Sequence, residues 1–130
     1  MRISPSVLLM CAVSIGCSNP FDGGWVCTDQ FVPGIVVEIR DAGTGIPVAE
    51  EARGAVREGT YVDSLRPGFS AASDPSLLLS RFAAGERAGT YSVEIQRSGY
   101  QTWTANNVVV VSDRCHVITQ RLRADLIPAP

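Results

Sequence analysis

The amino-acid sequence predicts an all-β protein, built as an antiparallel, Greek-key-like β-sandwich of about seven strands. The clearest strand covers 89–96, where Tyr91, Val93 and Ile95 alternate with polar residues, as in a strand with one buried and one solvated face. Glycine and proline interrupt the chain at short intervals, which is typical of all-β domains. No segment of the mature chain has a clear 3.6-residue period, so we expect little or no helix.

Four further strands are expected ahead of this central strand. In the first of them Ile35, Val37 and Ile39 share one face, which predicts that they enter the core. The turn after it contains Asp41, whose carboxylate is expected to accept backbone amides of its own turn. The four candidates are 35–40, 50–58 (where the alternation is weak), 59–65 and 77–82.

The segment 66–76 has two prolines and no periodicity, which predicts the longest surface loop of the domain. Loops carry binding residues more often than strands do, and Phe69 is an aromatic residue in this one. We favour Phe69 as a cover for the edge of the sandwich, and keep a ligand contact as the alternative.

Three more strands are expected after the central strand, at 100–104, 108–111 and 115–122, and the chain ends in a proline-containing tail, 127–130. The valine run 108–111 is short enough for a strand that is buried on both faces. Trp103 has polar neighbours and can lie on either face of its strand. Core or edge cover is the favoured interpretation of Trp103, with a ligand contact as the alternative.

Two motifs support a resemblance to a known family. One is the Gly89-Thr-Tyr-Ser-Val-Glu-Ile95 strand with its tight turn into Gly99-Tyr100, and the other is Asp41-Ala-Gly-Thr-Gly-Ile-Pro-Val48 after a long strand. Together they resemble the carboxypeptidase regulatory-like domain, a transthyretin-like β-sandwich, over roughly Gly34 to Leu122. The resemblance implies the fold and leaves the function open, because such sandwiches serve many unrelated roles.

The same structural group includes starch-binding-like sandwiches, which makes carbohydrate a candidate ligand by fold analogy alone. Its enzymatic branch, the hydroxyisourate hydrolases, carries several active-site histidines and a C-terminal Tyr-Arg-Gly-Ser. This chain has one histidine and ends in Leu126-Ile-Pro-Ala-Pro130, so that activity is not carried over.

The first residues read as an export signal. Arg2 is followed by an apolar stretch that is shorter than the roughly 20 residues needed to cross a bilayer, as in a signal peptide over 1–16. Its end, Ser14-Ile15-Gly16-Cys17, resembles a bacterial lipobox, which implies that Cys17 is acylated and becomes the mature N-terminus. Ser14 stands where that family prefers leucine, and the motif also fits ordinary cleavage, so plain secretion into the periplasm or beyond is the alternative.

The signal defines the remaining organisation: a lipid-anchored tether over 17–24, rich in turn-forming residues, and a domain over 25–126. By resemblance to enterobacterial lipoproteins, Ser18 directly after the acylated cysteine favours the outer over the inner membrane. The expected location is therefore the cell envelope, with the membrane as a partner through the lipid anchor.

Cysteine parity supports the same interpretation. Of the four cysteines, Cys11 leaves with the signal, and lipidation of Cys17 leaves Cys27 and Cys115 as a pair for an oxidising compartment. Without lipidation three thiols remain and one is unpaired. A Cys27–Cys115 bridge closes 88 positions and contributes about 4–5 kcal/mol in the chain-entropy model, with about 2–4 kcal/mol more usual.

Composition and motifs argue against several function classes. With 11 basic and 13 acidic residues and no basic cluster, nucleic acid is not an expected partner. His116 follows Cys115 in an expected strand, and neighbours in a strand point to opposite faces, so a Cys–His nucleophile is not expected. A metal site needs three or four ligands, and none is apparent, so we expect no metal and no cofactor.

The sequence therefore predicts a non-enzymatic envelope lipoprotein that acts as a binding or scaffolding module for an envelope protein or carbohydrate. The alternative is a carbohydrate-binding or accessory domain of an envelope carbohydrate- or peptide-processing system. An enzyme would require a convergent polar cluster in a concave site, which the sequence does not reveal.

Overall fold

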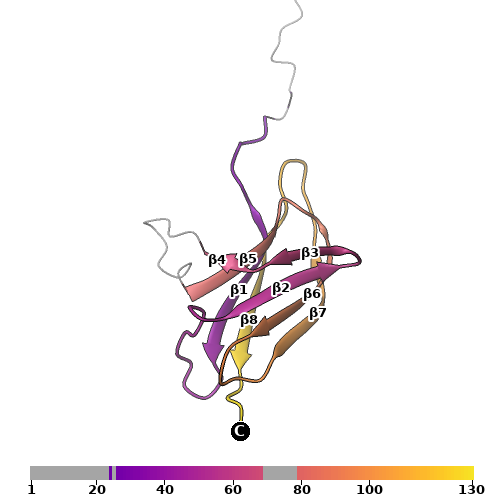
Figure 1. Ribbon diagram of the computed structural model, residues 1–130. Coiled ribbons are helices and arrows are strands. Elements are labelled where there is room, and N and C mark those ends of the chain that lie inside the picture. Colours follow the sequence, from indigo (N-terminus) through magenta and orange to yellow (C-terminus); the bar gives the residue numbers. More distant parts are fainter. Residues whose placement is uncertain (1–23, 25, 69–78) are drawn as a thin grey trace, which may run out of the picture.

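The computed structural model describes residues 24, 26–68 and 79–130, and there it is a sandwich of two four-stranded sheets (Figure 1). The described residues form no α-helix, and hence no helix that could span a bilayer. The strands are β1 (Pro33–Asp41), β2 (Arg53–Glu58), β3 (Tyr61–Ser64), β4 (Arg66–Pro67), β5 (Ser80–Gly85), β6 (Gly89–Gln96), β7 (Trp103–Val110) and β8 (Gln120–Leu126). The all-β sandwich is confirmed, with eight strands in place of about seven.

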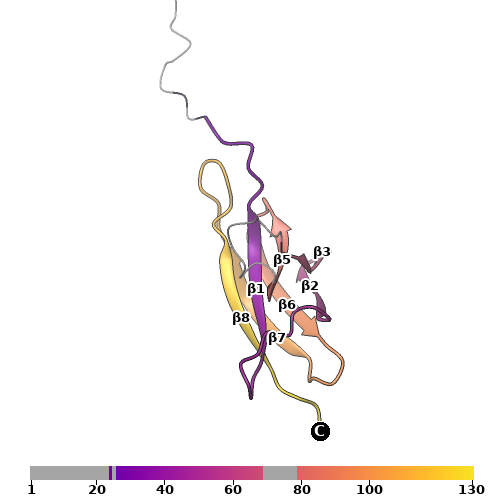
Figure 2. The same ribbon diagram turned by 90° about the vertical axis from the view of Figure 1, so that its left-hand side faces the viewer.

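The sheets have the orders β4-β5-β1-β8 and β3-β2-β6-β7. Every neighbouring pair is antiparallel except β1 and β8, which are parallel and lie side by side with the same direction (Figure 2). The predicted antiparallel sandwich is confirmed, and the β1–β8 pair is the one parallel exception among the described strands. After β7, at the edge of one sheet, the chain crosses to the edge of the other sheet and returns as β8. There β8 lies beside β1 and runs in the same direction as β1.

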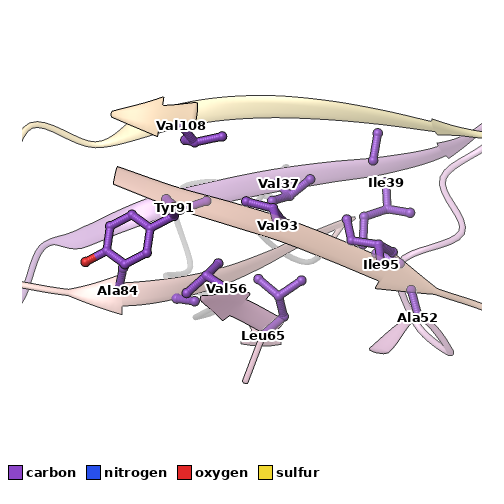
Figure 3. Packing of buried hydrophobic residues seen from close by; sticks show 14 of the residues in the cluster. Val37, Ile39, Ala52, Val56, Leu65, Ala84, Tyr91, Val93, Ile95 and Val108 are labelled. Atoms are coloured by element: carbon purple, nitrogen blue, oxygen red, sulfur yellow. The ribbon is translucent and has the colours of Figure 1, made fainter. Parts of the chain in front are cut away.

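The predicted alternation builds the core. Ile35, Val37 and Ile39 are fully buried on the inner face of β1, as expected. Tyr91, Val93 and Ile95 face them from β6, each at most 1% exposed (Figure 3). Burying one side chain of this size stabilises the fold by about 1.5–3 kcal/mol, so these two rows supply much of the driving force for the sandwich.

The two strands expected at 100–104 and 108–111 are one strand, β7. The pairing with β6 shifts between Tyr91↔Val108 and Val93↔Ala105, which leaves one extra residue in β7 as a β-bulge. Asn107 has φ +58° at this point, a conformation that asparagine tolerates better than most residues. The asparagine pair thus bends the strand without ending it.

The valine run is buried on one face, in contrast to the expectation. Val108 and Val110 are buried in the core, while Val109 and Val111 are about half exposed. The reason is that the described residues form two layers only, so the outer face of the sheet that contains β7 is not covered by a third layer of them.

The last strand begins at Gln120, five residues later than expected. Residues 111–118 form a hairpin instead, closed by a Ser112–Val117 bridge and by the Ile118 amide donating to the Val111 carbonyl. At its turn, Oδ1 of Asp113 accepts the amides of Cys115 and His116, at 2.7 and 2.8 Å. Cys115 and His116 therefore lie in a turn, and the argument that they point to opposite faces of a strand does not apply.

Smaller differences concern the ends of other strands. β2 begins at Arg53, because 50–52 forms a turn ahead of it. The buried Arg81 stabilises this turn, since its Nη2 donates a hydrogen bond to the Glu50 carbonyl at 2.7 Å. β5 extends to Gly85, and the short β4 lies at the start of the expected loop. The tail 127–129 pairs with 99–101 through two backbone hydrogen bonds.

The turn after β1 is built as predicted. Oδ1 of Asp41 accepts the amides of Gly43 and Thr44, at 2.8 and 2.7 Å, and the Thr44 hydroxyl at 3.0 Å. Tyr100 donates its hydroxyl to Oδ2 of the same carboxylate at 2.9 Å, which joins this turn to the one after β6.

Candidate functional site at the disulfide-bonded end

Cys27 and Cys115 form a disulfide, with their Cα atoms 5.2 Å apart and a separation of 88 positions in the sequence. The bridge joins the segment before β1 to the turn of the 111–118 hairpin, at the end of the sandwich where the N-terminal segment leaves (Figures 1 and 2). Structural disulfides persist in oxidising compartments, so the bridge indicates a location outside the cytoplasm.

The residues that directly follow the two half-cystines meet each other. Thr28 Oγ1 lies 3.0 Å from His116 Nε2, and His116 Nδ1 lies 3.0 Å from Glu86 Oε1. Because an ionised carboxylate only accepts hydrogen bonds, Nδ1 of His116 carries the proton that points to Glu86. In the neutral imidazole Nε2 is then the acceptor for the Thr28 hydroxyl, an assignment that follows from the partners.

Glu86 is held in place by its backbone and by its side chain. Its Oε1 accepts the Val32 amide at 2.7 Å, and its own amide donates to the Val32 carbonyl at 3.0 Å. Partial burial raises the pKa of the Glu86 carboxyl, but the hydrogen bonds from the Val32 amide and from His116 outweigh burial and lower the pKa. The carboxylate is therefore ionised at neutral pH and has a defined orientation towards the imidazole.

These side chains border a hollow of about 470 Å³ in the surface. Most of its lining is polar, and Phe31, 47% exposed, is its apolar wall. The Phe31 ring packs edge-on against the Phe82 ring, with the ring centroids 6.0 Å apart. A Cβ atom at position 85 would lie only 2.3 Å from the Phe31 ring, so this placement of the ring requires glycine at position 85. The lining residues are Thr28, Asp29, Gln30, Phe31, Glu86, Cys115 and His116.

A hydroxyl, an imidazole and a carboxylate in this order can do two things. They can fasten the segment before β1 to the hairpin, or the imidazole can take the proton of the hydroxyl and make it a nucleophile. Sequence reasoning missed the group because it placed His116 in a strand and singled out neither Thr28 nor Glu86. The sequence signal was the Cys-Thr and Cys-His pairs, since a disulfide brings the residues that follow its half-cystines close together.

A second hollow, of about 830 Å³, lies at the opposite end of the sandwich between 50–53 and 96–102. Arg97 lies over the Tyr100 ring at 5.0 Å and reaches Glu51 at 3.3 Å. Its Nε is buried and has no hydrogen-bond partner among the described residues. This hollow is polar and its charges are largely matched, which suits a polar, uncharged ligand better than a strongly charged one.

Trp103, the one candidate ligand residue from the sequence that the structure describes, lines neither of these two hollows. Trp103 pairs with Ile95 on the core face of its sheet and packs partly buried against the core, so that part of the indole is open to solution. Phe69 and Cys17 lie outside the described residues. Within the described part of the chain, no three histidine, cysteine or acidic side chains are grouped as a metal ion would require.

Comparison with known proteins adds no assignment. No protein-family model matches the chain, and no curated protein sequence matches it. The two-sheet β-sandwich therefore rests on the structure, and the carboxypeptidase regulatory-like family stays a prediction from the motifs in the sequence.

Proposed function

We propose that the protein is a cell-envelope lipoprotein whose carboxypeptidase regulatory-like sandwich serves as a binding or scaffolding module. The observation that carries this proposal is the Ser14-Ile15-Gly16-Cys17 motif ahead of a domain in which Cys27 and Cys115 are paired. Pairing of these two leaves Cys17, once the signal is removed, as the one cysteine for acylation.

The position of the disulfide supports a tethered module. Ten positions separate Cys17 from Cys27, and a fully extended chain of that length spans at most about 35 Å. The disulfide-bonded end, with the 111–118 hairpin, is thereby kept within about 35 Å of the lipid anchor. Ser18 after the lipidated cysteine favours the outer membrane.

The intact mass of the protein, purified from its native envelope without reductant, tests the proposal. The expected mass is that of 17–130 plus a diacyl- or triacylglyceryl group, less two hydrogens for the disulfide. A mass without lipid contradicts the anchor, and the protein is then a secreted domain with an unpaired Cys17.

A carbohydrate ligand is the second candidate function, favoured by the large polar hollow near the start of β7. Trp103 lies in β7 beside that end and is partly open to solution, so its fluorescence can follow binding. We expect a saturable change on titration with polysaccharide at up to about millimolar sugar, the range of weak binding. An unchanged spectrum over that range excludes a carbohydrate at this end of the sandwich.

A further inference from the structure

We propose that Thr28, His116 and Glu86 form an acyl-transfer site, in which the Thr28 hydroxyl attacks small, uncharged esters. This activity goes beyond the binding function proposed above. It also differs from the expectation that the chain is not an enzyme. That expectation lacked a convergent polar cluster, and the structure brings one together beside a shallow, solvent-open hollow.

The roles follow from the geometry. Thr28 Oγ1 and His116 Nε2 are 3.0 Å apart, within the reach that a nucleophile and its general base need. Glu86 accepts from the other ring nitrogen at 3.0 Å, which selects the tautomer with a free lone pair on Nε2. A carboxylate in this position also stabilises the imidazolium that forms when the hydroxyl proton is transferred.

Each member of the group is fixed by a separate constraint. The disulfide holds the residues that precede Thr28 and His116, and Asp113 accepts the His116 amide. Glu86 has φ +50°, a conformation that residues other than glycine rarely adopt and that costs about 1–3 kcal/mol. Ala84, two positions earlier, also has a positive φ, of +53°, so the conformation belongs to the turn, and within this turn the Glu86 side chain contacts His116 and Val32.

The hollow limits the class of substrate. The hollow is shallow and open to solvent, which admits small molecules without enclosing them, and Phe31 offers an apolar surface to the acyl group. Gln30 lines the same hollow, and we assign its side-chain amide as the donor for the oxyanion. Asp29 lies beside it and repels anions, so neutral esters are favoured over charged ones.

The chemistry is a two-step transfer without a cofactor. In the first step Thr28 Oγ1 bonds to the ester carbonyl carbon, His116 Nε2 takes the hydroxyl proton, and the carbon–alkoxide bond breaks as that proton passes to the leaving alcohol. In the second step water attacks the acyl-threonine, His116 takes a proton from the water and returns it to Thr28 Oγ1, and the acid is released. Atoms and charges balance in both steps.

The test is hydrolysis of para-nitrophenyl acetate by the mature chain, 17–130, with its disulfide intact and with Cys17→Ser to remove the free thiol. The chain contains no lysine, so few other nucleophiles compete. We expect Thr28→Val and His116→Gln each to lower kcat/KM by about 100-fold or more, the usual contribution of a general base. Glu86→Gln should lower kcat more than it changes KM, because Glu86 positions the base without touching the substrate.

Two controls separate catalysis from a structural role of the three side chains. Thr104→Val removes an exposed threonine hydroxyl from β7 and should leave the rate unchanged. Thr28→Ser restores a hydroxyl at the nucleophile position and should recover part of the rate that Thr28→Val loses. Quenching during turnover should leave one acetyl group on the peptide that contains Thr28. If Thr28→Val hydrolyses the ester as fast as its parent, or if Thr28 carries no acetyl group, the proposal is wrong and the three side chains only fasten the hairpin.

Discussion

Removal of the Cys27–Cys115 bridge should destabilise the domain through its unfolded state. In the chain-entropy model, a loop of 88 positions restricts the unfolded chain by 2.1 + 1.5R ln 88 cal/mol/K, which is about 4.6 kcal/mol at 25 °C. Measured values are more often about 2–4 kcal/mol. For a domain of about 100 residues this corresponds to a fall in Tm of about 10–20 °C.

The folded state should change little, because other contacts hold the segment before β1. The Val32 amide donates to Glu86, and Phe31 packs against Phe82. Cys27→Ser combined with Cys115→Ser removes the bridge without leaving a thiol, and thermal melts followed by circular dichroism measure the effect. Wild-type protein treated with an alkylating agent but no reductant is the control.

Kinetics tests the reasoning itself. If the bridge acts on the unfolded chain, the double variant folds more slowly and unfolds at nearly the wild-type rate. A Tm within about 2 °C of wild type contradicts the stabilisation. A normal folding rate with much faster unfolding would instead mean that the two ends of the loop come together only after the transition state.

Three further predictions concern the sandwich. Gly54→Ala should destabilise the domain by about 1–3 kcal/mol, because a Cβ at that position lies 2.1 Å from the Glu94 carbonyl oxygen. Gly43→Ala is the matched control, since the nearest contact of its Cβ is at 3.4 Å. Equal urea midpoints for the two variants would contradict the argument. Tyr91→Phe should cost about 1–1.5 kcal/mol in urea unfolding, since the hydroxyl bonds to both the guanidinium and the carbonyl of Arg87, and a neutral result would show that water replaces it. The Thr44 amide, the Tyr100 hydroxyl and the Thr44 hydroxyl lower the pKa of Asp41, so its stabilising effect is present above the unfolded pKa of about 3.9 and is lost as pH falls through the lower folded pKa. The stability difference between wild type and Asp41→Asn should accordingly be largest near pH 7 and shrink towards pH 3, and a difference independent of pH would contradict it.

Much of the fold could be predicted because alternation is a local property. The rows Ile35-Val37-Ile39 and Tyr91-Val93-Ile95 face the core whichever strand lies beside them, since the side-chain period of a strand is two. Where the predicted strand ends differ from those in the structure, the cause is a local backbone feature that hydrophobic periodicity does not reveal. The asparagines before Val108 suggested a break, yet one positive φ at Asn107 absorbs the irregularity within β7.

The candidate site could not be predicted in the same way. Thr28, Glu86 and His116 belong to three segments, and only Cys115 and Cys27 tie two of these together in a way that a sequence can suggest. The third contact depends on the turn after β5, where Glu86 takes a conformation that sequence patterns assign to glycine.

The sequence by itself determined the fold class, the buried face of each central strand, the turn in which the Asp41 carboxylate accepts backbone amides, and the pairing of Cys27 with Cys115. The tertiary structure decided the parallel pairing of β1 with β8, the hairpin that carries His116, and the meeting of His116 with Thr28 and Glu86. The physical reason is that periodicity acts between residues a few positions apart, whereas these features depend on where the chain crosses between sheets. That crossing is set by the packing of the whole core.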